Sequence, residues 1–118
     1  MVREDEPRWH IRVVASARKD IKKIHKGSAK TDLHTELKDK LGRAPLEFGE
    51  PLRGDLYPAR RLRIGKFRAV YLPVEKEGIV YILSVRHRGE VYQDGRLREY
   101  LRDILNQIEE DRPPGEEG

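Results

Sequence analysis

Apolar residues alternate with polar ones at the start of the chain and then recur every three or four positions. The alternation predicts a strand at 9–14. A helix capped by Ser16 is predicted next, because one helical face collects the apolar residues Ala17, Ile21 and Ile24. Leucines spaced by four residues predict a second helix around 33–41. Since few residues separate the two helices, we expect an antiparallel helical hairpin.

The second half of the chain has the pattern of a small sheet followed by a helix. Prolines and glycines interrupt every regular pattern at 44–58, which predicts a loop. Three strand-like runs with short turns between them follow at 60–64, 68–74 and 79–85. Apolar residues at helical spacing predict a last helix at 96–109. The expected fold is therefore α+β: an N-terminal strand, a two-helix hairpin packed on a small, mainly antiparallel sheet, and a C-terminal helix.

Composition limits the size of the core and the extent of the domain. Charged residues make up 39% of the 118 residues, yet Leu, Ile, Val and Phe together supply 30, about a quarter, which exceeds the level typical of disordered chains. The formal net charge is +4, although 109–118 alone carries five acids and one arginine. We therefore expect one folded domain at 9–108, with a charge near +8, between a flexible N-terminus at 1–8 and a disordered acidic tail at 109–118.

Several classes of protein and chemistry are excluded by what the sequence lacks. Without cysteine there is no disulfide framework, thiolate nucleophile or zinc–thiolate site. No cluster of His, Asp and Glu has metal-ligand spacing, and no glycine-rich phosphate loop is present, so we expect neither metal nor cofactor. The longest uncharged apolar stretch, 78–85, is too short to span a membrane, and the N-terminus does not resemble a signal peptide. We expect a soluble cytoplasmic protein that does not bind membranes.

Basic residues are concentrated in the predicted strands. The stretch 53–92 contains nine basic and four acidic residues. Within the strand 60–64, alternation places Leu62 and Ile64 on one face and two arginines on the other, which predicts an apolar face for the helical hairpin and an arginine-lined face. A single arginine there is readily solvated, but several on adjacent strands favour an anionic partner. The candidate RNA-binding residues are Arg60, Arg61, Arg63, Lys66 and Arg88.

A second group of candidate residues lies at the end of the last predicted strand. Arg86, His87 and Tyr92 bring a guanidinium, an imidazole and a phenol within seven residues. Such groups suit phosphoryl transfer on RNA, through charge stabilisation, proton transfer and stacking or orientation of the substrate. The alternative interpretation makes His87 an ordinary strand-end residue and Tyr92 a core aromatic.

Motifs at these positions resemble the RelE/ParE toxin superfamily over about 9–105. The resemblance is carried in order by ARKDI at 17–21, PLRGDL at 51–56, LRIGKFRAVY at 62–71 and HRGEVY at 87–92. It implies the compact α/β fold of that family and a toxin of a type II toxin–antitoxin pair. The implied partners are a cognate antitoxin, the ribosome and mRNA, with DNA contacted only indirectly through the antitoxin complex.

The resemblance also implies a reaction and roles for individual residues. RelE-like toxins cleave mRNA in the ribosomal A site without a metal, by attack of a ribose 2′-OH on the adjacent phosphate, and so inhibit translation and arrest growth. By this likeness, Arg68 holds the scissile phosphate, Arg86 acts on the phosphate or leaving group, and Tyr92 stacks on or orients the substrate. Arg61 stands where RelE has a lysine proposed as general base.

The identity of the general base is therefore open. Arg61 hardly accepts a proton at neutral pH, because the pKa of a guanidinium exceeds about 12. His87 is the remaining candidate for acid–base work, and Glu50 and Glu90 are more distant alternatives.

Two other functions fit the same sequence. A ParE-like toxin would inhibit DNA gyrase through protein–protein contacts, and neither the fold nor the hairpin motif separates it from a nuclease. A basic nucleic-acid-binding module without chemistry would bind RNA or DNA in a salt-dependent way and cleave neither.

Overall fold

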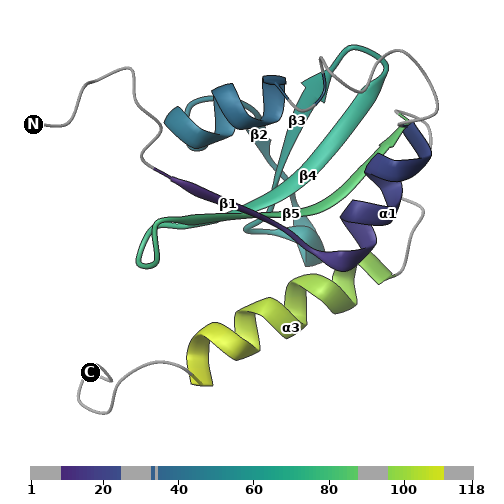
Figure 1. Ribbon diagram of the computed structural model, residues 1–118. Coiled ribbons are helices and arrows are strands. Elements are labelled where there is room, and N and C mark those ends of the chain that lie inside the picture. Colours follow the sequence, from purple (N-terminus) through teal and green to yellow (C-terminus); the bar gives the residue numbers. More distant parts are fainter. Residues whose placement is uncertain (1–8, 25–32, 34, 88–95, 111–118) are drawn as a thin grey trace, which may run out of the picture.

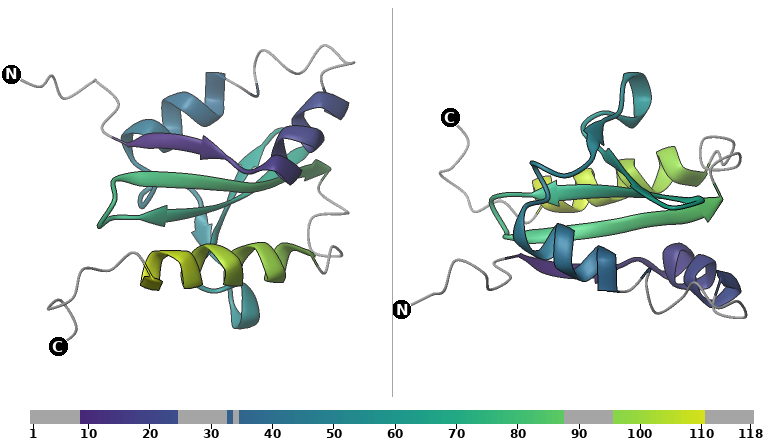
Figure 2. Two further views of the ribbon diagram at one scale, coloured as in Figure 1. Left: turned by 60° about the horizontal axis from the view of Figure 1, so that its bottom comes forward. Right: turned by 90° about the horizontal axis from the view of Figure 1, so that it is seen from above.

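A five-stranded sheet lies between two helical layers (Figure 1, Figure 2). The computed structural model describes residues 9–24, 33, 35–87 and 96–110. In chain order the elements are β1 (His10–Val13), α1 (Ala15–Ile24), the π-helical segment η1 (Leu37–Leu41), β2 (Glu50–Pro51), the 3-10 turn η2 (Gly54–Leu56), β3 (Arg60–Ile64), β4 (Phe67–Val74), β5 (Ile79–His87) and α3 (Arg96–Glu110).

The strand order is β1-β5-β4-β3-β2, so the first strand of the chain lies beside the last. β1 runs parallel to β5, with His10 opposite Ile79, and all other pairs are antiparallel. A β-bulge between β4 and β5, near Tyr71, shifts their register by one residue. The expected α+β fold with a mainly antiparallel sheet is confirmed.

α1 and the helical region around η1 cover one face of the sheet (Figure 2). Ala17 and Ile21 of α1 and Leu37 and Leu41 of η1 are buried with Tyr71 and other strand residues. This is the apolar face expected for the helical hairpin, although the connection at 25–32 falls outside the described residues. Helical geometry extends on both sides of η1, over 35–43.

α3 covers much of the opposite face, which the sequence predicts to be lined with arginines. A second core forms there, in which Leu97, Leu101 and Ile104 pack against strand residues such as Val70 and Leu72. The arginines therefore line only part of that face, and an apolar core occupies the rest. The amphipathic α3 needs an apolar surface to cover. The strands supply it because β4 and β5 carry apolar residues on both of their faces.

The ends of the elements differ from the predicted ones in ways that matter for the site. β5 continues two residues beyond its predicted end, so that Arg86 and His87 belong to the strand. α1 begins before Ser16, whose hydroxyl does not cap the helix but donates a hydrogen bond to the Leu83 carbonyl at 3.2 Å. The predicted loop at 44–58 contains the edge strand β2, which is too short to show a periodic pattern.

The chain ends are only partly visible. α3 continues to Glu110, while 1–8 and 111–118 fall outside the described residues, so the flexible N-terminus and acidic tail stay predictions. Within the described ranges, no helix combines the length and apolarity needed to cross a membrane.

Candidate active site

Three arginines from three adjacent strands form a single row across one end of the sheet. Arg63 of β3 lies directly opposite Arg68 of β4, which lies directly opposite Arg86 of β5. Side chains directly opposite each other share a sheet face, with Cβ atoms about 4.5–5.5 Å apart. Like charges in such positions repel each other, so this arginine row is electrostatically suited to an anion. The row is the part of the predicted arginine-lined face that remains beyond the core under α3.

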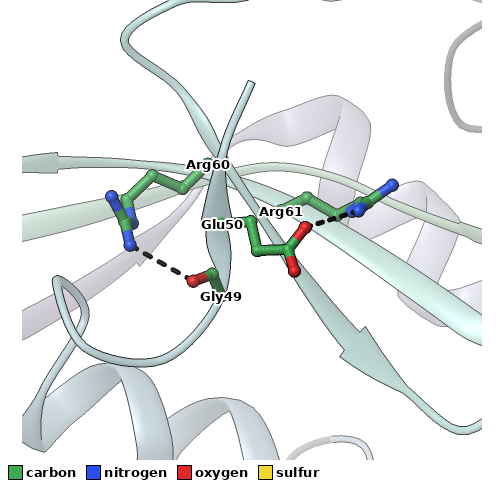
Figure 3. A network of polar contacts seen from close by, with 4 residues as sticks. All are labelled: Gly49, Glu50, Arg60 and Arg61. Atoms are coloured by element: carbon green, nitrogen blue, oxygen red, sulfur yellow. Dashed lines mark hydrogen bonds and ion pairs between the residues drawn. The ribbon is translucent and has the colours of Figure 1, made fainter. Parts of the chain in front are cut away.

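The neighbouring row on the same face mixes charged and neutral side chains. Glu50 lies opposite Arg61, Arg61 opposite Val70, and Val70 opposite Ser84. Arg61 Nη2 pairs with Glu50 Oε2 at 2.8 Å, so a carboxylate offsets its charge (Figure 3). Ser84 is only 5% exposed, and its hydroxyl has no hydrogen-bond partner among the described residues.

Asp20 of α1 reaches the outer end of the arginine row. Its carboxylate is 7% exposed, and Oδ2 accepts a hydrogen bond from the Val85 backbone N–H at 3.1 Å. The other oxygen, Oδ1, lies 3.5 Å from Arg86 Nε in an ion pair. The helix layer on one face is thus connected to an arginine of the opposite face.

The middle arginine of the row contacts its own hairpin turn. Arg68 Nη1 donates hydrogen bonds to the carbonyls of Gly65 at 2.9 Å and Phe67 at 2.8 Å. These bonds hold one terminal nitrogen of the guanidinium against the β3–β4 turn. Lys66, another candidate RNA-binding residue, is exposed within that turn.

His87 does not join the arginine row. It lies opposite Phe67, one position beyond the Arg68–Arg86 pair, so alternation places it on the α1 face of the sheet. The two rings meet edge to face, with centroids 6.1 Å apart. Both residues line an open cavity of about 380 Å³ between α1 and the end of β5, and Arg86 and Asp20 line the same cavity.

Arg60 also lies on the α1 face, where it has structural contacts. Its Nε donates to the Tyr71 hydroxyl at 3.3 Å, and its Nη2 donates to the carbonyls of Leu46 at 3.0 Å and Gly49 at 3.2 Å. Figure 3 shows Arg60 and Arg61 leaving β3 on opposite sides. Arg60 therefore ties the loop before β2 to the sheet instead of joining the arginine row.

Three of the candidate residues lie outside the described part of the chain: Arg88, Glu90 and Tyr92. Within the ranges that the structure describes, no three His, Asp or Glu side chains gather in a way that could hold a metal ion.

Sequence reasoning missed the burial of two polar side chains, Asp20 and Ser84. Asp20 stands on the apolar stripe of its helix, and a carboxylate in such a stripe indicates a specific buried partner. Ser84 interrupts the otherwise apolar run at 79–85 of β5. The pattern around Asp20 does not identify Arg86 as its neighbour, because that contact depends on how α1 packs against β5.

Comparison with known proteins gives a consistent result. The family model described as the ParE toxin of the type II toxin-antitoxin system parDE matches residues 11–92. Toxin RelG of Mycobacterium tuberculosis is 31% identical over 85 residues, which cover 72% of this chain and 97% of RelG.

Two solved structures share the fold. One is the toxin–antitoxin complex RelBE2 from Mycobacterium tuberculosis, with 31% identity, a TM-score of 0.57, and coverage of 70% of this chain and 99% of the matched chain. The other is an arginine double mutant of Escherichia coli toxin RelE in the free state, with 20% identity, a TM-score of 0.58, and coverage of 72% and 87%. At 20% identity, the second likeness concerns the fold alone.

Proposed function

The chain belongs to the RelE/ParE toxin superfamily of type II toxin–antitoxin systems, and from this premise we propose that it is an endoribonuclease that cleaves mRNA on the ribosome. The observation that carries the proposal is the arginine row, Arg63, Arg68 and Arg86, on three adjacent strands. A row of guanidiniums matches the phosphate backbone of a nucleic acid in both charge and geometry.

In the proposed reaction, a ribose 2′-OH attacks the adjacent phosphorus atom. The P–O bond to the next nucleotide breaks, which leaves a 2′,3′-cyclic phosphate on one product and a 5′-OH on the other. The phosphate gains negative charge on the way, and the preorganised donors of Arg68 and Arg86 stabilise this charge more strongly in the transition state than in the ground state.

The position of each candidate base bears on the transfer of the 2′-OH proton. Arg61 remains a poor proton acceptor and is paired with Glu50. Glu50 shares the face of the arginine row, whereas His87 lies on the opposite face. His87 nevertheless lines one cavity together with Arg86, so Glu50 and His87 are both kept as candidates for the general base.

Partners follow from the same proposal. The substrate is mRNA in the A site of the ribosome, which places the toxin in the cytoplasm. A cognate antitoxin neutralises it, as supported by the relative solved as a toxin–antitoxin complex. DNA is contacted only through that complex.

Cleavage of mRNA on programmed ribosomes tests the proposal. We expect Arg86→Ala and Arg68→Ala each to lower the cleavage rate about 100-fold to 1000-fold, the usual cost of removing one donor to a developing oxyanion, and to relieve growth arrest in cells. Arg43→Ala is the matched control, because Arg43 is exposed and its ion pair among the described residues is with Asp39, four residues earlier, at 3.1 Å. Wild-type cleavage rates in both Arg68→Ala and Arg86→Ala would refute the site.

Inhibition of DNA gyrase is the second candidate function, favoured by the match to the ParE family model. A gyrase supercoiling assay beside the ribosome assay separates the two functions, since a ParE-like toxin inhibits supercoiling and leaves mRNA intact. A non-catalytic nucleic-acid-binding module would show salt-dependent binding with neither effect.

A further inference from the structure

The buried stripe of α1 contains one charged residue. Ala17, Asp20 and Ile21 are the buried residues of this helix, whereas its lysines are exposed. Burial of a carboxylate costs free energy unless the group is paired and hydrogen-bonded, and an apolar side chain would fit the stripe without that cost. The contacts of Asp20 therefore have to explain its presence.

Both carboxylate oxygens of Asp20 are directed to consecutive residues of β5. Oδ2 accepts from the Val85 N–H at 3.1 Å, and Oδ1 lies 3.5 Å from Arg86 Nε. The pairing of β1 with β5 ends at Val13 and Ile82, so Val85 lies beyond the end of the neighbouring strand. Asp20 thus provides this backbone N–H with the acceptor that a strand would otherwise provide.

The contact to Nε constrains the guanidinium where it joins the rest of the side chain. An arginine has several rotatable bonds, and its planar fork binds a phosphate well only when its plane is correctly oriented. The ion pair at Nε favours one orientation of that plane, in which a bidentate contact to phosphate oxygens would be made end-on, through the two Nη groups. Arg86 is also the end member of the arginine row, where only Arg68 flanks it within the row.

We propose that Asp20 is a positioning residue that holds Arg86 in its phosphate-binding orientation. This inference rests on the proposed nuclease function for its effect on cleavage. A residue of α1, which covers the opposite side of the sheet, then helps to set the geometry of the arginine row.

Asp20→Asn is the most informative variant. The amide oxygen still accepts from the Val85 N–H, but the charge that attracts Arg86 is removed. We expect the single-turnover cleavage rate on saturated ribosomes to fall about 10-fold to 100-fold, as for misplacement of a catalytic group, while the affinity for ribosomes changes little. Thermal unfolding monitored by circular dichroism checks that the variant is folded.

A double-mutant cycle tests whether Asp20 acts through Arg86. In an Arg86→Ala background, Asp20→Asn should cause no further loss of rate, whereas in the matched Arg63→Ala background it should cause its full loss. Equal losses in both backgrounds would show a general structural role and overturn the proposal. An unchanged rate for the single variant would overturn it as well and leave the nuclease function standing.

Side-chain NMR of arginine gives a measurement that does not depend on activity. In the folded wild-type protein, we expect the Arg86 Nε–Hε signal to exchange with solvent more slowly than that of exposed Arg43, and Asp20→Asn to remove this protection. Equally fast exchange of both signals in the wild type would overturn the proposed positioning. Absence of mRNA cleavage by the wild type, with Arg86 Nε–Hε protected, would instead refute the nuclease function alone.

Discussion

At the scale of single residues, the face of the sheet decides what each basic side chain does. Arg60 and Arg61 are neighbours in β3, yet one binds loop carbonyls on the α1 face and the other pairs with Glu50 on the face of the arginine row. The partner of Arg60 on its side is Tyr71, which is fully buried. The Tyr71 hydroxyl also lies 2.7 Å from the Pro45 carbonyl and close to that of Phe48.

We expect the stability of the protein to fall at alkaline pH because of Tyr71. Burial raises the pKa of Tyr71 above its ordinary value of 10.0, although Arg60 acts in the opposite direction. As the pH rises, the tyrosine of the unfolded chain therefore ionises before the tyrosine of the folded protein. The contribution of Tyr71 to stability is present below pH 10 and is lost as the pH rises through the pKa of the folded state. Urea unfolding at several pH values should show a smaller alkaline loss for Tyr71→Phe than for the wild type.

Two further details sharpen this test. At neutral pH, Tyr71→Phe should cost about 1–3 kcal/mol, because a buried carbonyl loses its donor. Tyr57→Phe is the control, since Tyr57 is 65% exposed and should leave the unfolding curve unchanged.

Burial also raises the pKa of Tyr81, helped by Glu77, so part of the alkaline loss of stability should remain in Tyr71→Phe. An identical alkaline loss in Tyr71→Phe and wild type would exclude the assigned role of Tyr71.

At the scale of elements, the entry into β2 depends on one glycine. Gly49 has a φ of +78°, a conformation that side chains disfavour. A Cβ atom there would lie 2.5 Å from both the Arg61 carbonyl oxygen and the Tyr71 hydroxyl. The short edge strand can therefore approach β3 only because this position has no side chain.

Gly49→Ala should destabilise the protein by at least about 1–3 kcal/mol in urea unfolding, through both the strained φ and the close contacts. Gly78→Ala is the matched control. Gly78 also has a positive φ, +68°, but a Cβ atom there would have no neighbour within 4 Å. The additional loss of unfolding free energy in Gly49→Ala, relative to Gly78→Ala, measures the cost of the close contacts. Equal losses in the two variants would show that those contacts cost nothing.

At the scale of the whole molecule, the sheet separates two distinct cores. The core under α3 contains Leu97, Leu101 and Ile104, and the core under α1 and η1 contains Ala17 and Leu41. Both are small, as expected for a chain of 118 residues. The stability of the arginine row therefore depends on packing on both sides of the strands that carry it.

Leu101→Ala should lower the free energy of unfolding by about 2–5 kcal/mol, because Leu101 is only 2% exposed and its truncation leaves a cavity beneath α3. Leu46→Ala is the control, since Leu46 is 45% exposed and should cost no more than about 0.5 kcal/mol. Chemical denaturation measures both. A loss below about 1 kcal/mol for Leu101→Ala would show that α3 contributes little to the stability of the fold.

Periodicity is enough to predict most of the elements, since the order of strands and helices follows from spacings of two and of three to four residues. It also predicts the division of β3 into Leu62 and Ile64 on one face and Arg61 and Arg63 on the other. It does not predict the register that aligns Arg63 with the other two members of the row, because register depends on the turn and on the bulge in β5.

Other features depend on contacts between distant segments. Periodicity predicts an apolar face on α3 but not the surface that it covers, so the second core appears only in the structure. His87 could be recognised as a strand-end residue, yet its face follows only from its pairing with Phe67. Asp20 and Val85 are 65 positions apart, a separation across which no local pattern can connect them.

The pairing of β1 with β5 also has a consequence in time. A chain is synthesised from its N-terminus, so β1 and α1 leave the ribosome long before the strand that completes their surroundings. The contacts that join them, Ser16 to Leu83 and Asp20 to Val85, close loops of 67 and 65 residues. The arginine row therefore cannot form until β5 has been synthesised. During translation, the nascent chain therefore lacks the assembled row until β5 has left the ribosome.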